Sequence, residues 1–158
     1  ELAQLSILIN APLEINIFHS SKKRELKIKN HFEKHGAKNT LLPDKHHKIK
    51  FLNSNRKYVN PNGILKADAV FVPLEDGDRT EALIKNGKKV IAIDLNPLSR
   101  TAQKATITIV DNITRAMPML ILTIKKLKKY DKSKLEKIMK GYNNKKILNE
   151  ALKSVRNS

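Results

Sequence analysis

The sequence predicts an α/β fold with a mainly parallel sheet. Three short apolar runs, at residues 69–72, 90–93 and 107–110, are rich in β-branched residues. Runs of this kind, separated by helical patterns, are typical of buried parallel strands. A polar segment bearing Asp or Asn follows each run. Because ligands bind at the carboxyl ends of the strands in open α/β sheets, these three segments are the first candidates for a functional site.

The first third of the chain adds a β-α-β unit to this sheet. Apolar spacing predicts a helix over residues 1–10, and the alternation in 13–18 predicts a strand. A helix then runs from Ser20 or Ser21, either of which can cap it, to about His35, where Gly36 ends it. Residues 39–42 predict a second strand, and residues 43–66 a long loop with one helical turn.

Helices dominate the last third of the chain. After a short helix that begins at Asp78 and ends near residue 87, the pattern predicts helices over 113–130, 133–140 and 144–156. Lysine becomes frequent from about residue 125. We therefore expect an α/β domain at residues 1–124 and a basic helical extension at residues 125–158.

The charge is uneven along the chain. The formal net charge is +17, and residues 125–158 hold 12 Lys or Arg against 3 Asp or Glu, whereas residues 68–115 hold 7 of each. A lysine-rich helix is usually a solvated surface, which argues against nucleic acid as the main partner. The chain has no cysteine, which excludes thiolate chemistry, and no apolar run of about 20 residues. We expect a soluble, intracellular protein.

The polar segment after the first strand suits an anionic ligand. Asp76, Gly77 and Asp78 precede Arg79 and Thr80 at a helix start, so backbone N–H groups, a guanidinium and a hydroxyl could hold phosphate. The carboxylates could place Mg²⁺ beside a substrate phosphate. A well-capped turn explains the same residues equally well. Neither a P-loop nor a dinucleotide-binding glycine motif is present.

The segments after the second and third strands repeat the theme. Pro97 forces Asn96 out of helical geometry at the end of the second strand. Asp94 and Leu95 open the segment after the second strand. Side chains that can donate hydrogen bonds to an anion follow in this segment and in the one after the third strand. The donors are Ser99, Arg100 and Thr101 after the second strand, and Asn112, Thr114 and Arg115 after the third.

The histidines offer one candidate. His31 and His35 lack a third ligand nearby, and the adjacent His46 and His47 cannot both face one metal from a strand, so we assign no metal ligands. His19 stands at the end of a predicted strand, where it could transfer a proton or bind substrate. Arg56 lies in the donor-rich segment 53–56, which turn chemistry explains as well as function does.

These residues resemble a known family. VFVPLEDGDRTEAL at 70–83 and KKVIAIDLNPLSRTAQKATITIVDNITRA at 88–116 resemble archaeal phosphopantothenate synthetase, also called 4-phosphopantoate–β-alanine ligase. LEINIFHSSKKREL and FLNSNR also resemble it, so the likeness covers roughly residues 1–120. It implies an ATP-dependent ligation in coenzyme A biosynthesis, in which 4-phosphopantoate and β-alanine form 4′-phosphopantothenate through an acyl-adenylate. It also implies a Rossmann-like three-layer sandwich and a cytoplasmic homodimer.

The resemblance also suggests roles. Residues after the first two strands would line the ATP pocket, with Mg²⁺: Asp76, Gly77, Asp78, Arg79, Thr80, Asp94, Leu95 and Asn96. The donors Ser99, Arg100, Thr101, Asn112, Thr114 and Arg115 would contact the acid substrate. His19 and Arg56 would meet its carboxylate or phosphate, and with Asn96 they are the expected catalytic residues. The chemistry needs arginines and oriented amides and no nucleophilic side chain.

The sequence departs from the family at its start, and the lysine-rich end past about residue 125 resembles nothing specific in the family. Family members carry a longer, helix-rich N-terminal region with basic residues that contribute to the nucleotide site. The chain would then be either a fragment or a shortened paralogue. A paralogue could bind nucleotide or a phosphometabolite without completing the ligation, and this is the alternative function. A basic nucleic-acid-binding protein is a third, less favoured one.

Overall fold

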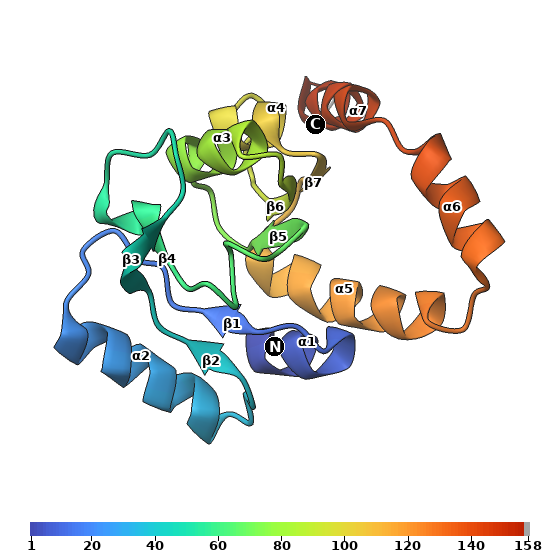
Figure 1. Cartoon of the computed structure of the whole chain (residues 1–158). Coiled ribbons are helices and arrows are strands. Elements are labelled where there is room, and N and C mark those ends of the chain that lie inside the picture. Colours follow the sequence, from blue (N-terminus) through green and yellow to red (C-terminus); the bar gives the residue numbers. More distant parts are fainter. Residues whose placement is uncertain (157–158) are drawn as a thin grey trace. The chain divides into compact units, whose positions relative to one another are not determined.

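The computed structural model describes residues 1–156 and divides the chain into two compact units. Unit 1 comprises residues 1–70 and 82–89, and unit 2 comprises residues 71–81 and 90–158. Helices and two-stranded or three-stranded sheets alternate along the chain (Figure 1). The expected α/β class with parallel strands is therefore confirmed. The division expected at residue 124 is a different one and stays a prediction.

Unit 1 begins with the expected β-α-β arrangement. α1 (Leu2–Ile9) leads into β1 (Leu13–Glu14), which pairs in parallel with β2 (Thr40–Leu41). α2 (Lys22–Lys34) lies between them in sequence, and the Ser21 hydroxyl caps it by accepting from the N–H of Arg24. Gly36 follows with a φ of 89°, the left-handed geometry that glycine adopts at a helix end.

β1 is shorter than the strand predicted over residues 13–18. Ile15 still bonds to Leu41, but Asn16 turns its amide toward another segment, where it donates to the carbonyls of Arg56 and Tyr58 at 3.1 and 2.9 Å. Asn16 is buried, so both of these bonds are shielded from water. The strand pairing therefore ends after Ile15, and from Asn16 onward the chain is held by the hydrogen bonds of the Asn16 side chain.

The prediction of a loop over residues 43–66 was wrong in part. β3 (Asp44–Lys48) and β4 (Tyr58–Val59) form an antiparallel pair, and η1 (Asn55–Lys57) between them supplies the expected helical turn. β3 has the sequence DKHHK, in which no apolar side chain alternates with a polar one. Hydrophobic periodicity could not reveal it. Asp44 holds the strand locally by accepting from the backbone N–H of His46.

The segment after β4 folds around one carboxylate. Glu14 accepts from the backbone N–H groups of Asn60 and Ile64, at 2.9 and 2.6 Å. A Cβ on Gly63 would lie 2.1 Å from Oε2 of Glu14, so only glycine fits there without displacing the carboxylate.

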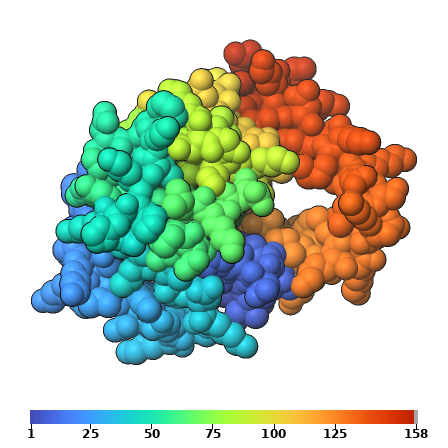
Figure 2. Space-filling model, in the orientation of Figure 1, coloured from blue at the N-terminus to red at the C-terminus, as the bar shows by residue number. Residues whose placement is uncertain are grey.

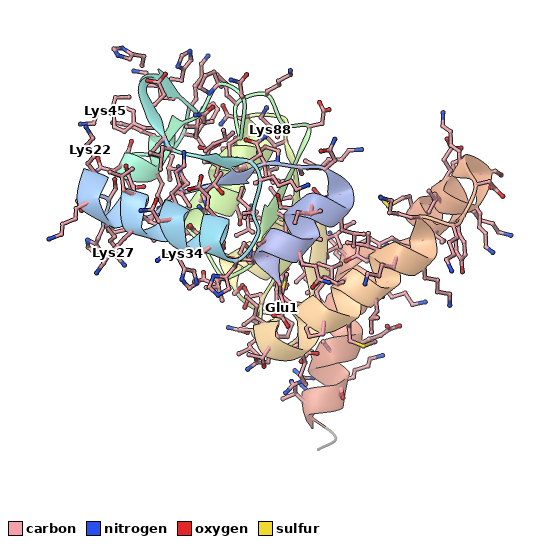
Figure 3. The ribbon with its side chains drawn as sticks, turned by 90° about the horizontal axis from the view of Figure 1, so that it is seen from below. Glu1, Lys22, Lys27, Lys34, Lys45 and Lys88 are labelled. Atoms are coloured by element: carbon pink, nitrogen blue, oxygen red, sulfur yellow. The ribbon has the colours of Figure 1, made fainter. Side chains whose placement is uncertain are left out.

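α2 buries no residue. Lys22, Lys27 and Lys34 lie along it with their side chains directed outward (Figure 3).

Three strands take the places of the predicted apolar runs. β5 (Ala69–Val72), β6 (Lys89–Ile93) and β7 (Ile107–Ile109) form one sheet in that order, and β6 pairs in parallel with β7. The unit boundaries fall within β5 and β6, and β7 belongs to unit 2. α3 (Gly77–Lys85) joins β5 to β6 and begins one residue before the predicted start. Its cap is Asp76, not Asp78, since Asp76 Oδ1 accepts from the N–H of Arg79.

Unit 2 continues through four more helices. α4 (Arg100–Lys104) was not predicted, because five residues are too few to show a helical period. α5 (Ile113–Leu127), α6 (Lys132–Gly141) and α7 (Asn144–Arg156) follow the predicted ranges. α7 packs against β7 and α4, and its surface adjoins that of α4 in Figure 2. Within residues 1–156, no helix has both the length and the apolar character to span a membrane.

Candidate functional site

Two groups of polar residues, one in each unit, are candidates. The first, here named the tip cluster, comprises residues 75–80 after β5 and residues 94–101 after β6, all in unit 2. The second is a hollow in unit 1 that residues 18–20 and 53–55 line. Each is built by contacts within its own unit.

The β5 side of the tip cluster is held by ionic and capping contacts. Arg79 Nε lies 3.1 Å from Asp76 Oδ2, and the exposed fractions of the two side chains are only 17% and 9%. Glu75 accepts from the backbone N–H of Gly77 at 3.2 Å. Because both partners of the pair are largely withdrawn from water, their attraction is screened less than at an open surface. The guanidinium is therefore fixed at the start of α3.

α4 joins the β5 side to the β6 side. The Thr101 hydroxyl accepts from the backbone N–H of Asp76 at 2.9 Å and lies 3.2 Å from Glu75 Oε1, to which it donates. Arg100 forms an ion pair with Asp78. A Cβ on Gly77 would lie 2.7 Å from Arg100 Nε, so the absence of a side chain there lets the guanidinium pass.

A buried carboxylate holds the β6 side of the tip cluster. Asp94 is 5% exposed and accepts from the backbone N–H of Asn96 at 2.9 Å and from the hydroxyl of Ser99. Asn96 in turn accepts from the N–H of Leu98, so its side chain shapes the turn before Pro97. Leu95 is 65% exposed beside it. The Asp94 side chain thus organises the whole turn from residue 94 to residue 99.

Thr80 is the least explained member of the tip cluster. It is fully buried, and its hydroxyl has no hydrogen-bond partner among residues 1–156. Its backbone N–H completes the first turn of α3 by donating to Asp76. Since a buried hydroxyl without a partner costs about 1–3 kcal/mol, Thr80 is a weak point in the packing of the tip cluster.

The segment after β7 is occupied by local contacts. Asn112 caps α5 by accepting from the N–H and the hydroxyl of Thr114. Arg115 pairs with Asp111, and its side chain is 69% exposed. The hydrogen bond from Arg115, followed by that from the backbone N–H of Asn112, holds the pKa of Asp111 below its usual range. These hydrogen bonds and this ion pair all lie within residues 111–115.

The tip cluster suits a metal only when phosphate completes the ligand set. Residues 1–156 contain no group of three or more His, Asp or Glu that could hold a metal ion. Glu75, Asp76 and Asp78 nevertheless lie within four residues of each other. Mg²⁺ is commonly bound by one or two carboxylates together with substrate phosphates and water, and these three are the carboxylates that could contribute to such a site.

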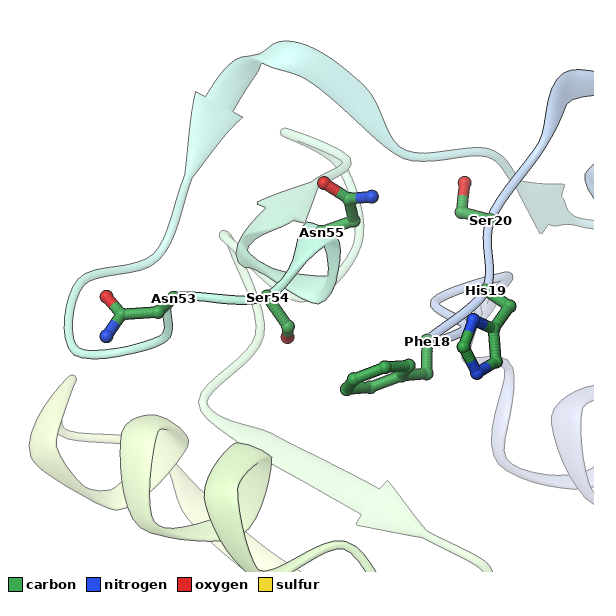
Figure 4. A pocket seen from close by; sticks show the side chains of 6 residues that line it. All are labelled: Phe18, His19, Ser20, Asn53, Ser54 and Asn55. Atoms are coloured by element: carbon green, nitrogen blue, oxygen red, sulfur yellow. The ribbon is translucent and has the colours of Figure 1, made fainter.

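The hollow in unit 1 has a volume of about 470 Å³. Its lining comes from two segments far apart in sequence, as Figure 4 shows: Phe18, His19, Ser20, Asn53, Ser54 and Asn55. The rings of Phe18 and His19 meet edge to face with their centroids 4.9 Å apart. His19, predicted as a site residue, therefore lies in the wall of a pocket.

Arg56, the other predicted site residue of unit 1, borders this hollow. Its guanidinium carbon lies 4.8 Å from the centroid of the Phe18 ring, and its Nε lies 3.3 Å from the hydroxyl of Ser54. The two bonds from buried Asn16 to the carbonyls of Arg56 and Tyr58 fix the backbone here. The structure thus places His19 in the wall of one pocket and Arg56 at its border.

Sequence reasoning missed several residues of this pocket. The sequence predicts Phe18 and Asn16 only as parts of a strand, and turn chemistry explains the side chains at residues 53–55 as well as function does. The alternation of LEINIF gives no signal for Asn16, because the pattern puts it on the same face as Glu14, the face expected to be polar. The hydrogen-bond partner of Asn16, the backbone of residues 56–58, is 40 positions away and is not visible in the sequence.

The whole chain, residues 1–158, matches the family described as Phosphopantothenate/pantothenate synthetase. A 4-phosphopantoate–beta-alanine ligase from Thermococcus onnurineus is 46% identical over 99% of the chain and 60% of that protein. Ligases of the same name from Thermococcus kodakarensis and Methanosarcina mazei are 45% and 41% identical, over 99% and 98% of the chain and 60% and 61% of those proteins. The chain spans about three fifths of these relatives. It belongs to the phosphopantothenate/pantothenate synthetase family.

Proposed function

We propose that the chain forms the nucleotide-binding and acid-binding part of an ATP-dependent ligase that joins 4-phosphopantoate to β-alanine. The observation that carries this proposal is the family match over residues 1–158, with relatives of 41–46% identity that bear the ligase name. The tip cluster and the pocket of unit 1 support it, because the reaction has two phosphorylated substrates to hold.

The tip cluster would bind ATP. Arg79, fixed by Asp76, and the N-terminus of α3 place positive charge and N–H groups where a phosphate could approach. Mg²⁺, when bound with the triphosphate, would neutralise part of its charge and so relieve the repulsion from Glu75, Asp76 and Asp78. Asp94, Leu95 and Asn96 would line the same site, with the exposed Leu95 offering an apolar surface to the base.

The pocket of unit 1 would bind the acid. His19, Ser20, Asn53 and Asn55 supply hydrogen-bonding side chains, and Arg56 supplies a guanidinium at the border. The exposed ring of Phe18 offers apolar surface to a branched carbon chain. A guanidinium suits either end of 4-phosphopantoate, since both carboxylate and phosphate accept two parallel N–H bonds. Ser99, Arg100, Thr101, Asn112, Thr114 and Arg115 are the alternative acid contacts.

The chemistry itself would need positioning more than reactive side chains. A carboxylate is a poor electrophile until an adenylyl group is attached, with release of pyrophosphate. The amine of β-alanine then displaces AMP and forms the amide. Arg56 and His19 would orient the carboxylate in the pocket of unit 1, and Asn96 would supply an amide donor in the tip cluster. A mixed anhydride hydrolyses easily, so the site must exclude water during the reaction.

Further properties belong to the same proposal. We infer a Rossmann-like three-layer sandwich with a lysine-rich helical extension, a cytoplasmic homodimer, and a division of the chain near residue 124. Small-molecule substrates, rather than nucleic acid, would account for the neutral charge of residues 68–115.

Ligand-dependent thermal unfolding of the 158-residue chain tests the proposal. ATP with Mg²⁺ and 4-phosphopantoate should each raise the melting temperature, because a ligand at 100 times its Kd adds about 2.7 kcal/mol of stability. Formation of AMP and 4′-phosphopantothenate on adding β-alanine would extend the result from binding to catalysis. Binding without product would favour the non-catalytic alternative. Stabilisation by a DNA duplex alone, lost as salt rises, would contradict the proposal.

A further inference from the structure

The side chain of Asn144 has partners for all four of its hydrogen-bonding positions. Its Nδ2 lies 3.0 Å from the carbonyl of Ala102 and 3.3 Å from that of Ala105. Its Oδ1 accepts from the backbone N–H of Thr108 at 2.9 Å and from the hydroxyl of Tyr142 at 2.8 Å. An Asn amide offers two donors and two acceptor lone pairs, so this side chain is fully used.

These partners belong to two elements of unit 2. Ala102 lies in α4 and Ala105 directly follows it, while Thr108 lies in the edge strand β7. Thr108 adds a further tie, since its hydroxyl donates to Ala102 at 2.9 Å. Asn144 therefore fastens the end of α4 and the outer edge of β7 to the start of α7.

α4 needs such support. It has only five residues, and a helix that short does not hold its shape in water without tertiary contacts. Its other end carries the side chains that join the tip cluster. Thr101 bonds to Asp76 and Glu75, Arg100 pairs with Asp78, and Ser99 bonds to Asp94. A shift of α4 would move all of these contacts together.

The adjacent residue has a different task. Asn143 accepts from the backbone N–H of Lys146 and so caps α7. Asn144 makes no such local bond and directs its amide to α4 and β7. The two neighbouring asparagines thus have separate roles: Asn143 caps α7, and Asn144 attaches α7 to α4 and β7.

We propose that Asn144, supported by Tyr142, is a positioning residue that sets the tip cluster through α4. The role rests on the proposed function for its link to ATP. A loss of Asn144 releases the end of α4, and Thr101, Arg100 and Ser99 lose their fixed distance to the acidic residues of the tip cluster. ATP binding weakens, whereas binding of 4-phosphopantoate to the pocket of unit 1 does not change.

The test compares Asn144→Ala with its neighbour Asn143→Ala in the 158-residue chain, at a temperature where circular dichroism shows both to be fully folded. Calorimetric titration with Mg²⁺-ATP should give a Kd raised about 10-fold in Asn144→Ala, the effect of about 1.4 kcal/mol, and within about two-fold of wild type in Asn143→Ala. The Kd for 4-phosphopantoate should be unchanged in both. Equal ATP affinity in the two variants, or equal losses for both ligands in Asn144→Ala, would overturn the proposal.

Amide hydrogen exchange gives a second readout that does not need ATP. Exchange in residues 99–105 should be faster in Asn144→Ala than in Asn143→Ala, while exchange in α3 at residues 81–85 stays the same. Unchanged exchange in residues 99–105 would overturn the attachment itself. If wild type binds no ATP, the proposed function fails and this measurement alone decides the structural role. If Asn144→Ala does not fold, Tyr142→Phe, which removes only a hydroxyl, takes its place. It should also speed amide exchange in residues 99–105, by a smaller factor.

Discussion

The tip cluster of unit 2 and the pocket of unit 1 are both polar, but they are built in opposite ways. In the tip cluster each of Glu75, Asp76, Asp78 and Asp94 already accepts from a donor of the same unit. In the pocket, an exposed aromatic ring and short polar side chains surround an open hollow of about 470 Å³. The side chains of the tip cluster are already held in place, so ligand binding costs them little conformational entropy. The side chains around the pocket make fewer contacts with each other and would be held mainly by the ligand. Substitutions in the first should therefore disturb their neighbours, and substitutions in the second should act singly.

The largest effect is expected at Arg79. Arg79→Ala removes the guanidinium and leaves the Asp76 carboxylate, which is only 9% exposed, without this partner. We expect the KM for ATP to rise about 30-fold to 100-fold, the effect of losing about 2–3 kcal/mol from a charged hydrogen bond. Steady-state measurement of AMP formation, or calorimetry with Mg²⁺-ATP, checks the change. Arg156→Ala, in the last turn of α7, is the matched control, and an ATP constant that does not change in Arg79→Ala removes Arg79 from the site.

A smaller and more selective effect is expected at Arg56. Arg56→Ala should raise the Kd for 4-phosphopantoate about 10-fold and leave the Kd for ATP within about two-fold, because this guanidinium contacts Phe18 and Ser54 of the unit 1 pocket. Arg24→Ala, which loses a bond to the His19 carbonyl but no pocket side chain, serves as the control. A parallel loss of both ligands in Arg56→Ala would mean that the two regions do not act separately.

Gly77→Ala should have an intermediate effect that spreads within the tip cluster. The added methyl would lie 2.7 Å from Arg100 Nε and 3.1 Å from Arg100 Cβ, so both the side chain and the start of α4 must move. We expect a several-fold rise in the KM for ATP, equivalent to about 1 kcal/mol, with little change in melting temperature because Ala favours helix over Gly. Gly141→Ala, with no atom near the new methyl group, is the control. An unchanged KM would show that the tip cluster tolerates displacement of α4.

The smallest effect is expected from the Asp111–Arg115 pair. Arg115 holds the pKa of Asp111 below its usual range, so the pair contributes stability above the unfolded pKa of about 3.9, and this is lost as pH falls through the folded value. Both side chains are accessible to solvent, so the gain is small. Carboxyl NMR titration of Arg115→Gln should move the pKa of Asp111 upward and leave that of Asp44, which His46 and His47 lower, unchanged. No pH dependence of stability between pH 6 and 8 should follow from this pair.

The sequence predicted the tip cluster better than the pocket for a physical reason. β5, β6 and β7 are continuous apolar runs, and the acidic and basic residues that follow them are close neighbours along the chain. The short helix α4 escaped prediction because tertiary bonds at Thr101 and Asn144 stabilise it. The pocket depends on Asn16 reaching the backbone of residues 56 and 58, and on a hairpin whose strand β3 lacks apolar alternation. Contacts of that range are set by packing, which the local pattern does not contain.

The attachment at Thr108 also bears on which backbone groups the edge of the sheet offers to other strands. β7 is the last strand of its sheet, and an edge strand with unpaired backbone groups can pair with a strand of another chain. Here the side chains of Tyr142 and Asn144 accept hydrogen bonds from the N–H of Thr108. These residues leave the ribosome more than 30 positions after the strand itself. The edge of β7 is therefore covered at Thr108 only once residues 142 and 144 have been added to the chain.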